Sequence, residues 1–141
     1  MRRLSYLIIS CMLLGCTENV TEKNLPKLNG YWEIAKVVFP DGNTKDYSVN
    51  PLVDYVQLEG YQGFRKKVKP KFDGTYDTSN DAEPFRIVET KGRFYMVYEN
   101  TLDKWSEELL NLDDHSFSVV NEDGIRYDYR KFEPISVQKD E

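Results

Sequence analysis

Short apolar runs alternate with turn-forming residues along most of the chain, from Leu28 onward. The runs are rich in Val, Ile, Tyr, Phe and Thr, which favour a pleated, half-buried surface. Phe94, Met96 and Tyr98 share one face of such a run, and residues 124–129 alternate in the same way. The turn signals between the runs lie at 40–43, 59–63, 73–75, 79–84, 91–92, 112–114 and 122–124. This pattern predicts a succession of short β-strands.

One segment, 101–112, fits two patterns. Leu102, Trp105 and Leu109 recur at helical spacing, and the Glu, Lys and Leu residues of the segment favour helix. However, the residues that follow have the pattern of strand, turn and strand, which a further strand would join through a tight turn. We therefore predict a strand over 104–112.

The strands are predicted to form one domain over residues 28–135, followed by a polar C-terminal tail over 136–141. Roughly eight to ten short strands of this kind either close into a barrel or split into a two-sheet sandwich. Closure removes exposed strand edges. We therefore predict an all-β fold, a small antiparallel up-and-down barrel.

The N-terminus begins differently, with two arginines followed by a mostly apolar run over 4–14. A membrane-spanning helix needs about 20 apolar residues, so this shorter run is typical of a cleaved signal peptide, here over 1–15. The run ends in Leu-Leu-Gly-Cys at 13–16, which resembles the recognition site of bacterial lipoproteins. The resemblance implies that Cys16 becomes the acylated first residue of the mature chain. An ordinary signal peptide with an incidental cysteine is the alternative.

The residues after the cysteine extend this interpretation. By resemblance to lipoprotein sorting, Thr17 next to the acylated cysteine favours the outer membrane of a bacterial cell envelope. Residues 16–27 are polar, contain one proline and show no period, so we predict a flexible tether. The implied partner is the membrane, reached through acyl chains such as palmitate.

Composition narrows the possible partners. The chain has 19 basic and 24 acidic residues, and removal of the signal takes two arginines, which leaves 17 basic against 24 acidic residues and a net charge of −7. This balance argues against nucleic acid, because nucleic-acid binding needs a basic surface. The two cysteines are Cys11, which would leave with the signal, and Cys16, so no thiol would remain for a disulfide.

Few residues could carry catalysis or hold a metal. The single His115 lies in a predicted turn, and the sequence has no glycine-rich phosphate loop and no His or Cys cluster at metal-ligand spacing. A carboxylate pair for acid–base chemistry would have to come from distant residues such as Asp54 and Glu108. We therefore predict that the protein is not an enzyme and has no cofactor and no metal site.

The most unusual local feature is the basic run 63–72 in an otherwise acidic domain. Strict alternation places Lys66 on the apolar face with Phe64 and Val68, and it places the other basic residues on the opposite face. In one interpretation the run is a charged outer strand, and a bulge turns Lys66 outward. In another, Lys66 lies at the mouth of the barrel and meets the anionic group of a ligand, or the run docks an acidic partner. A buried lysine would need a carboxylate opposite it.

Aromatic residues of the late strands are the other candidates for a binding site. Tyrosine and tryptophan combine an apolar ring with a polar tip, so they suit both a core and a pocket lining. The predicted ligand-binding residues are Lys66, Tyr95, Tyr98, Trp105, Tyr127 and Tyr129.

The two ends of the domain resemble the lipocalins. Residues 28–32, Leu-Asn-Gly-Tyr-Trp, look like the Gly-x-Trp start of that family, and the segment 109–132 is similar to the close of lipocalin-like lipoproteins of bacterial envelopes. The resemblance implies that Trp32 plugs one end of the barrel and that an arginine of the last strands packs across its ring. Arg130 is the first candidate for this arginine and Arg126 the second.

The same resemblance implies a function. It points to a lipid-anchored, non-catalytic envelope protein that binds a small apolar or amphipathic ligand in the barrel. A small barrel can also be filled by its own side chains. The alternative is therefore a protein-interaction or glycan-binding module that acts through its outer surface. The sequence identifies neither the ligand nor a protein partner.

Overall fold

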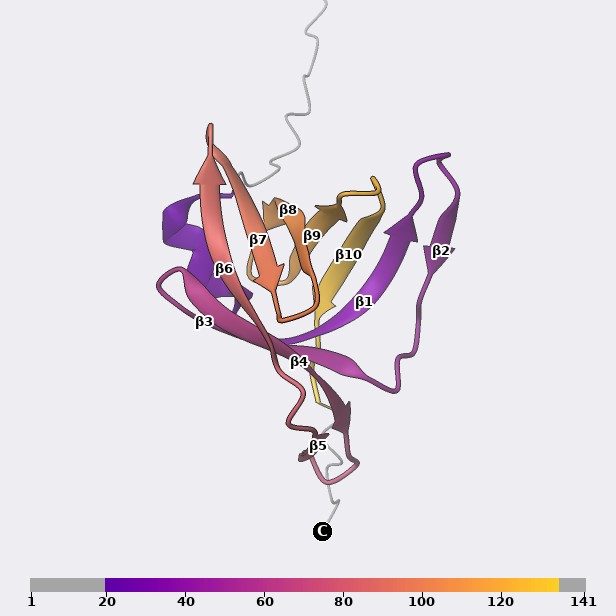
Figure 1. Ribbon diagram of the computed structural model, residues 1–141. Coiled ribbons are helices and arrows are strands. Elements are labelled where there is room, and N and C mark those ends of the chain that lie inside the picture. Colours follow the sequence, from indigo (N-terminus) through magenta and orange to yellow (C-terminus); the bar gives the residue numbers. More distant parts are fainter. Residues whose placement is uncertain (1–19, 135–141) are drawn as a thin grey trace, which may run out of the picture.

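Ten antiparallel strands form one sheet in the computed structural model, which describes residues 20–134. Their bounds are β1 Gly30–Val38, β2 Thr44–Asp46, β3 Val53–Glu59, β4 Gln62–Pro70, β5 Tyr76–Thr78, β6 Glu83–Thr90, β7 Arg93–Glu99, β8 Lys104–Leu112, β9 Ser116–Asn121 and β10 Arg126–Lys131. The order is β10-β9-β8-β7-β6-β4-β3-β1, and β10 also pairs with β1, so eight strands close on themselves (Figure 1). The predicted antiparallel up-and-down barrel is confirmed.

The two remaining strands are short additions to this barrel. Strand β2 pairs only with β1, and β5 pairs only with β4. In Figure 1, β5 and the end of β4 extend away from the barrel wall. Strand β4 pairs with β6 up to Arg65 and with β5 from Val68, so the two pairings divide its length.

The ambiguous segment over 104–112 is strand β8, as predicted. A β-bulge between Leu109 and Asn111 shifts the register of β8 against β9. Because the bulge adds one residue, Leu109 and Leu112 both face the core although they lie three positions apart. This local irregularity explains why the apolar residues of a strand showed helical spacing.

A short 3₁₀-helix, η1 (Glu22–Leu28), covers one end of the barrel. Leu25 is 2% exposed and Leu28 is fully buried, and both belong to the barrel core. The prediction of a flexible tether over 16–27 is therefore wrong for residues 22–27. Two leucines hold this polar segment against the barrel, because they occupy space at the barrel end that would otherwise be empty. The predicted signal peptide, Cys16 and the tail over 136–141 lie outside the described residues.

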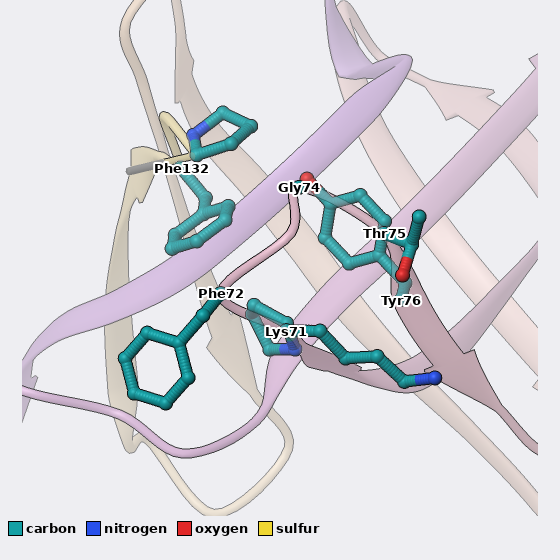
Figure 2. Close-up of a pocket in the computed structure, with 8 residues that line it drawn as sticks. Lys71, Phe72, Gly74, Thr75, Tyr76 and Phe132 are labelled. Carbon is teal, nitrogen blue, oxygen red and sulfur yellow. The ribbon is translucent and has the colours of Figure 1, made fainter. Parts of the chain in front are cut away.

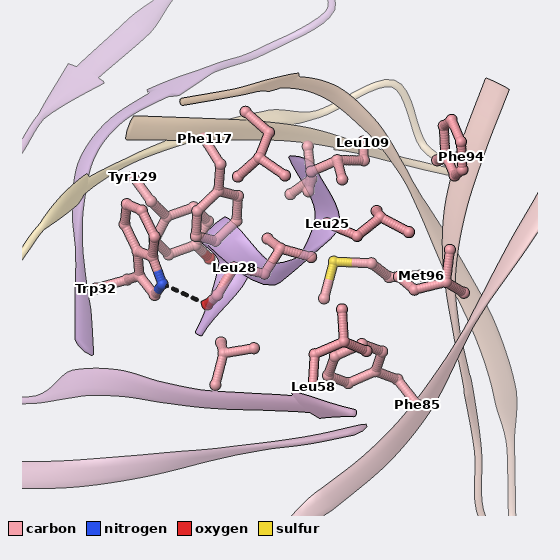
Figure 3. Close-up of a cluster of buried hydrophobic side chains, with 14 of the residues drawn as sticks. Leu25, Leu28, Trp32, Leu58, Phe85, Phe94, Met96, Leu109, Phe117 and Tyr129 are labelled. Carbon is pink, nitrogen blue, oxygen red and sulfur yellow. Dashed lines mark hydrogen bonds between the residues drawn. The ribbon is translucent and has the colours of Figure 1, made fainter. Parts of the chain in front are cut away.

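Trp32 closes the same end from the start of β1. Its ring is fully buried and meets Phe117 edge-on, with the ring centroids 4.8 Å apart. Its indole Nε1 donates a hydrogen bond of 2.8 Å to the carbonyl oxygen of Leu28, shown as the dashed line in Figure 3. The expected burial of Trp32 is confirmed, and the hydrogen bond ties the strand to η1.

The cation that packs on this tryptophan is a lysine, and the prediction of Arg130 or Arg126 is wrong. The ammonium of Lys131 lies 4.4 Å from the centroid of the Trp32 ring and donates a hydrogen bond of 2.8 Å to the carbonyl oxygen of Asn29. Strand register decides the matter, because Trp32 is directly opposite Lys131. Arg130 is one residue away and therefore on the other face, where it binds Glu33 at 2.6 Å. Arg126 binds Asp128 at 2.7 Å.

The backbone conformation at Gly30 favours glycine in this arrangement. Its φ of +126° is one that residues with a β-carbon rarely adopt. A β-carbon at this position would also lie 2.5 Å from the Lys131 ammonium. The glycine of the Gly-x-Trp segment thus leaves room for the cation that covers the tryptophan.

Apolar side chains fill the end of the barrel that η1 covers. Figure 3 shows Met96, Leu58, Phe85 and Leu109 packed around Leu28. These side chains are all buried, so this part of the barrel interior has no room for a ligand. Within residues 20–134, no helix is both long and apolar enough to cross a membrane.

Candidate functional site

The other end of the barrel is open and holds a cup of about 450 Å³. Its walls come from β3, β4 and β6 to β10, and from the loop before β6. The residues that line it are Asp54, Arg65, Lys66, Lys67, Asp81, Glu83, Tyr98, Trp105, Glu107, Asn121, Tyr127 and Tyr129. The lining therefore combines aromatic rings with charges of both signs.

The floor of the cup is built around Arg65 of β4. One guanidinium nitrogen, Nη2, donates to Asp54 Oδ2 at 2.9 Å and to the Tyr129 hydroxyl at 2.6 Å. The other, Nη1, donates to the Tyr98 hydroxyl at 3.4 Å. The Arg65 side chain is only 13% exposed, so these partners supply the compensation that a buried charge needs. Arg65 marks the depth at which the filled core ends and the cup begins.

The inward position of Arg65 reverses the prediction for this strand. The register pairs Arg65 with Val56 and Lys67 with Asp54, and these β3 partners are buried on the inner side. Strict alternation had placed both basic residues outside. It was wrong because it treated every charge as solvent-seeking, whereas Asp54, far away in sequence, makes an inward arginine stable.

Lys66 lies opposite Tyr55, between the two inward basic residues. The rings of Phe64 and Tyr55 contact each other at 5.9 Å on the same outer face. Lys66 nevertheless lines the cup, at its rim. The prediction that Lys66 and Phe64 share the inner face is therefore wrong, while a role for Lys66 at the mouth stays a prediction.

Asp54 is ionised by its neighbours in spite of its burial. Burial alone would raise the pKa of its carboxyl, but the Arg65 guanidinium and the Lys67 ammonium outweigh it and hold the pKa below its usual range. The Lys67 ammonium lies 2.7 Å from Oδ1, in a charge contact without a directed hydrogen bond to that oxygen. One carboxylate thus contacts two cationic side chains, those of Arg65 and Lys67.

Glu107 of β8 is less well compensated. Burial raises the pKa of its carboxyl above the usual range, and Arg65 offsets this only in part. The nearest described cationic atom is Arg65 Nη1, 3.9 Å from Glu107 Oε1, which is too long for a hydrogen bond. Its neighbour Glu108 points to the other face, where it lies 3.7 Å from Arg93. The carboxylate that approaches Asp54 is therefore Glu107, and the suggested pair of Asp54 and Glu108 is wrong.

Aromatic rings line the cup together with these charged groups. The rings of Tyr98 and Trp105 stack with their centroids 5.3 Å apart, and Tyr129 stacks on Phe117 at 4.6 Å. Burial raises the pKa of Tyr98 and that of Tyr129 to about 12. Both phenols therefore stay protonated near neutral pH and act as hydrogen-bond partners of Arg65 rather than as bases.

The structure brings five of the six predicted ligand residues to one place. Lys66, Tyr98, Trp105, Tyr127 and Tyr129 all line the cup. Tyr95 does not, because it lies opposite Glu108 and Val88 on the outer face of the sheet, one residue away from the buried Met96.

The central groups of the floor were not predicted as site residues. These are Asp54, Arg65 and Glu107, which come from β3, β4 and β8. Each has the local sequence pattern of an ordinary surface residue. The only available signal was a basic run in an acidic domain, which would need buried carboxylates if any of its members faced inward. In residues 20–134, no group of three or more His, Cys, Asp or Glu side chains could hold a metal ion.

A smaller slot lies on the outside, next to β5. It has a volume of about 80 Å³ and is lined by Pro70, Lys71, Phe72, Gly74, Thr75, Tyr76, Phe132 and Pro134 (Figure 2). Tyr76 stacks on Tyr31 with the ring centroids 4.2 Å apart, so these two rings cover each other. The slot has room for a few atoms, far less than the cup.

The likeness of this chain to known proteins lies in its fold. No protein-family model matches it, and no curated protein matches it. Among solved structures, a lipocalin-like protein from Bacteroides uniformis aligns with 75% of this chain and 99% of its own, at 14% identity and a TM-score of 0.48. A structural likeness at this identity does not indicate which ligand, if any, this chain binds.

Proposed function

We propose that the protein is a lipid-anchored, non-catalytic envelope protein that binds a small amphipathic ligand in the open end of its barrel. The observation that carries this proposal is the division of the barrel into a filled half and a cup of about 450 Å³ with aromatic walls above a charged floor. Ligand sites are typically concave, mostly apolar and supplied with a few placed polar groups.

The depth of the cup limits the ligand. Below Arg65 the barrel is filled by side chains such as Met96 and Phe117, so a long acyl chain has no room to extend into it. A ring or a short branched group fits better, with its apolar part against Trp105 and Tyr127 and its polar part toward the floor.

The floor also supports a binding role over catalysis. Arg65 and Lys67 are both tied to Asp54, and the two phenols at the floor keep their protons near neutral pH. Among residues 20–134 the cup presents no thiol and no imidazole. The hollows outside the cup, including the slot of about 80 Å³ next to β5, are all smaller than the cup among those found in residues 20–134, so they support the alternative of an interaction through the outer surface less well.

The ligand itself is the first test. Protein purified from its own host, released from detergent and analysed by native mass spectrometry should carry a small molecule in excess of the acylated chain. Tyr127→Ala removes a ring from the cup wall and should lose this added mass, whereas Tyr95→Ala removes a ring from the outer face and should keep it. A wild-type protein without added mass would contradict a site in the cup. The same holds if Tyr127→Ala keeps the added mass and Tyr95→Ala loses it.

The anchor is tested separately through Cys16, which lies outside the described residues. Cys16→Ser should stop cleavage by the lipoprotein peptidase and abolish acylation, because only the thiol accepts the diacylglyceryl group. Two or more acyl chains make anchoring stable, each buried methylene contributing about 0.8 kcal/mol. Immunoblots of membrane fractions washed in high salt should therefore show the wild type retained and the variant released; retention of the variant would contradict the anchor.

A further inference from the structure

The charged side chains of the cup differ in how closely they contact a partner of opposite charge. Its cations Arg65 and Lys67 both contact the Asp54 carboxylate, at 2.9 and 2.7 Å. The third cation, Lys66, is opposite Tyr55 and lines the cup from the outer side of β4. Both inner cations therefore share one carboxylate, which orients them toward Asp54 and away from the opening of the cup.

Of the charged groups on the floor of the cup, Glu107 is the one without a hydrogen-bonded partner of opposite charge. Its side chain is 15% exposed, it lines the cup, and its only described ion pair is the contact of 3.9 Å with Arg65. Asn121 lies directly opposite it on β9 and is also part of the lining. Two further carboxylates line the cup: Asp81 in the loop before β6, and Glu83 at the start of β6. The cup therefore contains four acidic and three basic residues, so its acidic groups outnumber its basic groups by one.

Aromatic residues line the same cup as this carboxylate. Trp105 and Glu107 are two residues apart in β8, and their β7 partners Tyr98 and Met96 are both buried inside the barrel. Trp105 and Glu107 therefore project from the same face of the sheet, with Tyr127 also in the lining. A cation over the face of a tryptophan or tyrosine is attracted by the ring, and the attraction grows when water is excluded.

We infer that the ligand of the cup is an organic cation, an ammonium group with an apolar ring or short chain, whose charge meets Glu107 between the rings of Trp105 and Tyr127. The inference rests on the proposed function, because it names the ligand class of the same cup. It replaces the anionic ligand that the basic run suggested, since the inward members of that run are bound to Asp54.

Three probes of similar size separate the charge of the ligand from its apolar part: benzyltrimethylammonium, phenylacetate and benzyl alcohol. Acylated full-length mature protein in lipid nanodiscs is titrated with each probe and followed by saturation-transfer NMR, with empty nanodiscs subtracted. The wild type should bind benzyltrimethylammonium more tightly than the other two. Glu107→Gln should raise the Kd of this cation about tenfold, which corresponds to about 1.4 kcal/mol, and should change the Kd of benzyl alcohol less than about twofold.

Glu108→Gln is the matched control. It removes the same charge from the next residue, on the outer face beside Arg93, and should leave all three affinities unchanged. Unchanged binding of benzyl alcohol by Glu107→Gln also shows that the variant has folded. Tyr127→Ala should weaken all three probes, because it removes part of the apolar wall.

The remaining outcomes overturn the inference in distinguishable ways. If phenylacetate binds most tightly and loses affinity in Lys66→Met, the ligand is an anion, and the cup remains a binding site. If the cation binds and Glu107→Gln does not weaken it, Glu107 is not its partner. If none of the three probes binds in a manner sensitive to Tyr127→Ala, both the cation and the proposed function of the cup are wrong.

Discussion

Arg65→Met should lower the free energy of unfolding by about 3–5 kcal/mol, because removal of one partner of a buried ion pair leaves the other charge without compensation. Here the remaining charge is that of Asp54, which is 3% exposed and would lose the hydrogen bond from Arg65 while keeping the contact with the Lys67 ammonium. The hydroxyl groups of Tyr98 and Tyr129 lose their charged donor at the same time. Urea denaturation followed by circular dichroism measures the change.

Two variants serve as controls for Arg65→Met. Lys69→Met removes a cation from an exposed position of the same strand and should change stability by less than about 0.5 kcal/mol. Arg65→Lys keeps the charge but lacks the planar fork that reaches Asp54 and Tyr129 together, so it should recover only part of the loss. A loss below about 1 kcal/mol for Arg65→Met would show that the floor of the cup is not a coupled network.

Trp32→Ala should cost about 3–5 kcal/mol, in the range of large-to-small changes of buried aromatic residues. The variant loses a fully buried ring, its contact with Phe117 and the hydrogen bond to Leu28 that holds η1 at the barrel end. The Lys131 ammonium would lose its aromatic partner as well. The same denaturation experiment tests this, and an unchanged midpoint would contradict the role of Trp32 as the plug.

The identity of the cation on Trp32 has its own readout. In a Trp105→Phe background, tryptophan emission reports Trp32 alone, since the chain has two tryptophans. Lys131→Met should alter this emission, whereas Arg130→Met, which removes the partner of Glu33 on the outer face, should leave it as it was. Emission that responds only to Arg130→Met would restore the arginine that the sequence suggested.

The barrel was predictable because its signals are local and repeated. Alternation in runs such as 94–98 defines strands one at a time, and tight turns between them leave few ways to connect them. The bulge at Leu109 shows the limit of this approach, because one extra residue gave a strand the spacing of a helix. Most of the aromatic lining could also be predicted from the sequence, because these residues lie on the inward face of the late strands.

The floor of the cup was not predictable in the same way. Whether Arg65 faces inward depends on Asp54, and the two residues become neighbours only when β3 and β4 take one particular register. The choice between Lys131 and Arg130 likewise depends on a shift of one residue between β1 and β10. The 3₁₀-helix η1 is held in place because Leu25 and Leu28 fill a space at the end of the closed barrel. The local sequence pattern gives no sign of this space.

The closed end of the barrel restricts which mutations the chain can accept. Gly30 is constrained twice, by its φ of +126° and by the Lys131 ammonium, which occupies the volume of a potential β-carbon. Exchanging Lys131 for a shorter residue would remove the second constraint and leave the first, so a substitution at position 30 would be strained with or without a change in its partner. The wall of the cup depends on side chains such as Trp105, Glu107 and Tyr127 at ordinary strand positions. Evolution could therefore alter the choice of ligand at one end without disturbing the backbone geometry that holds the other end closed.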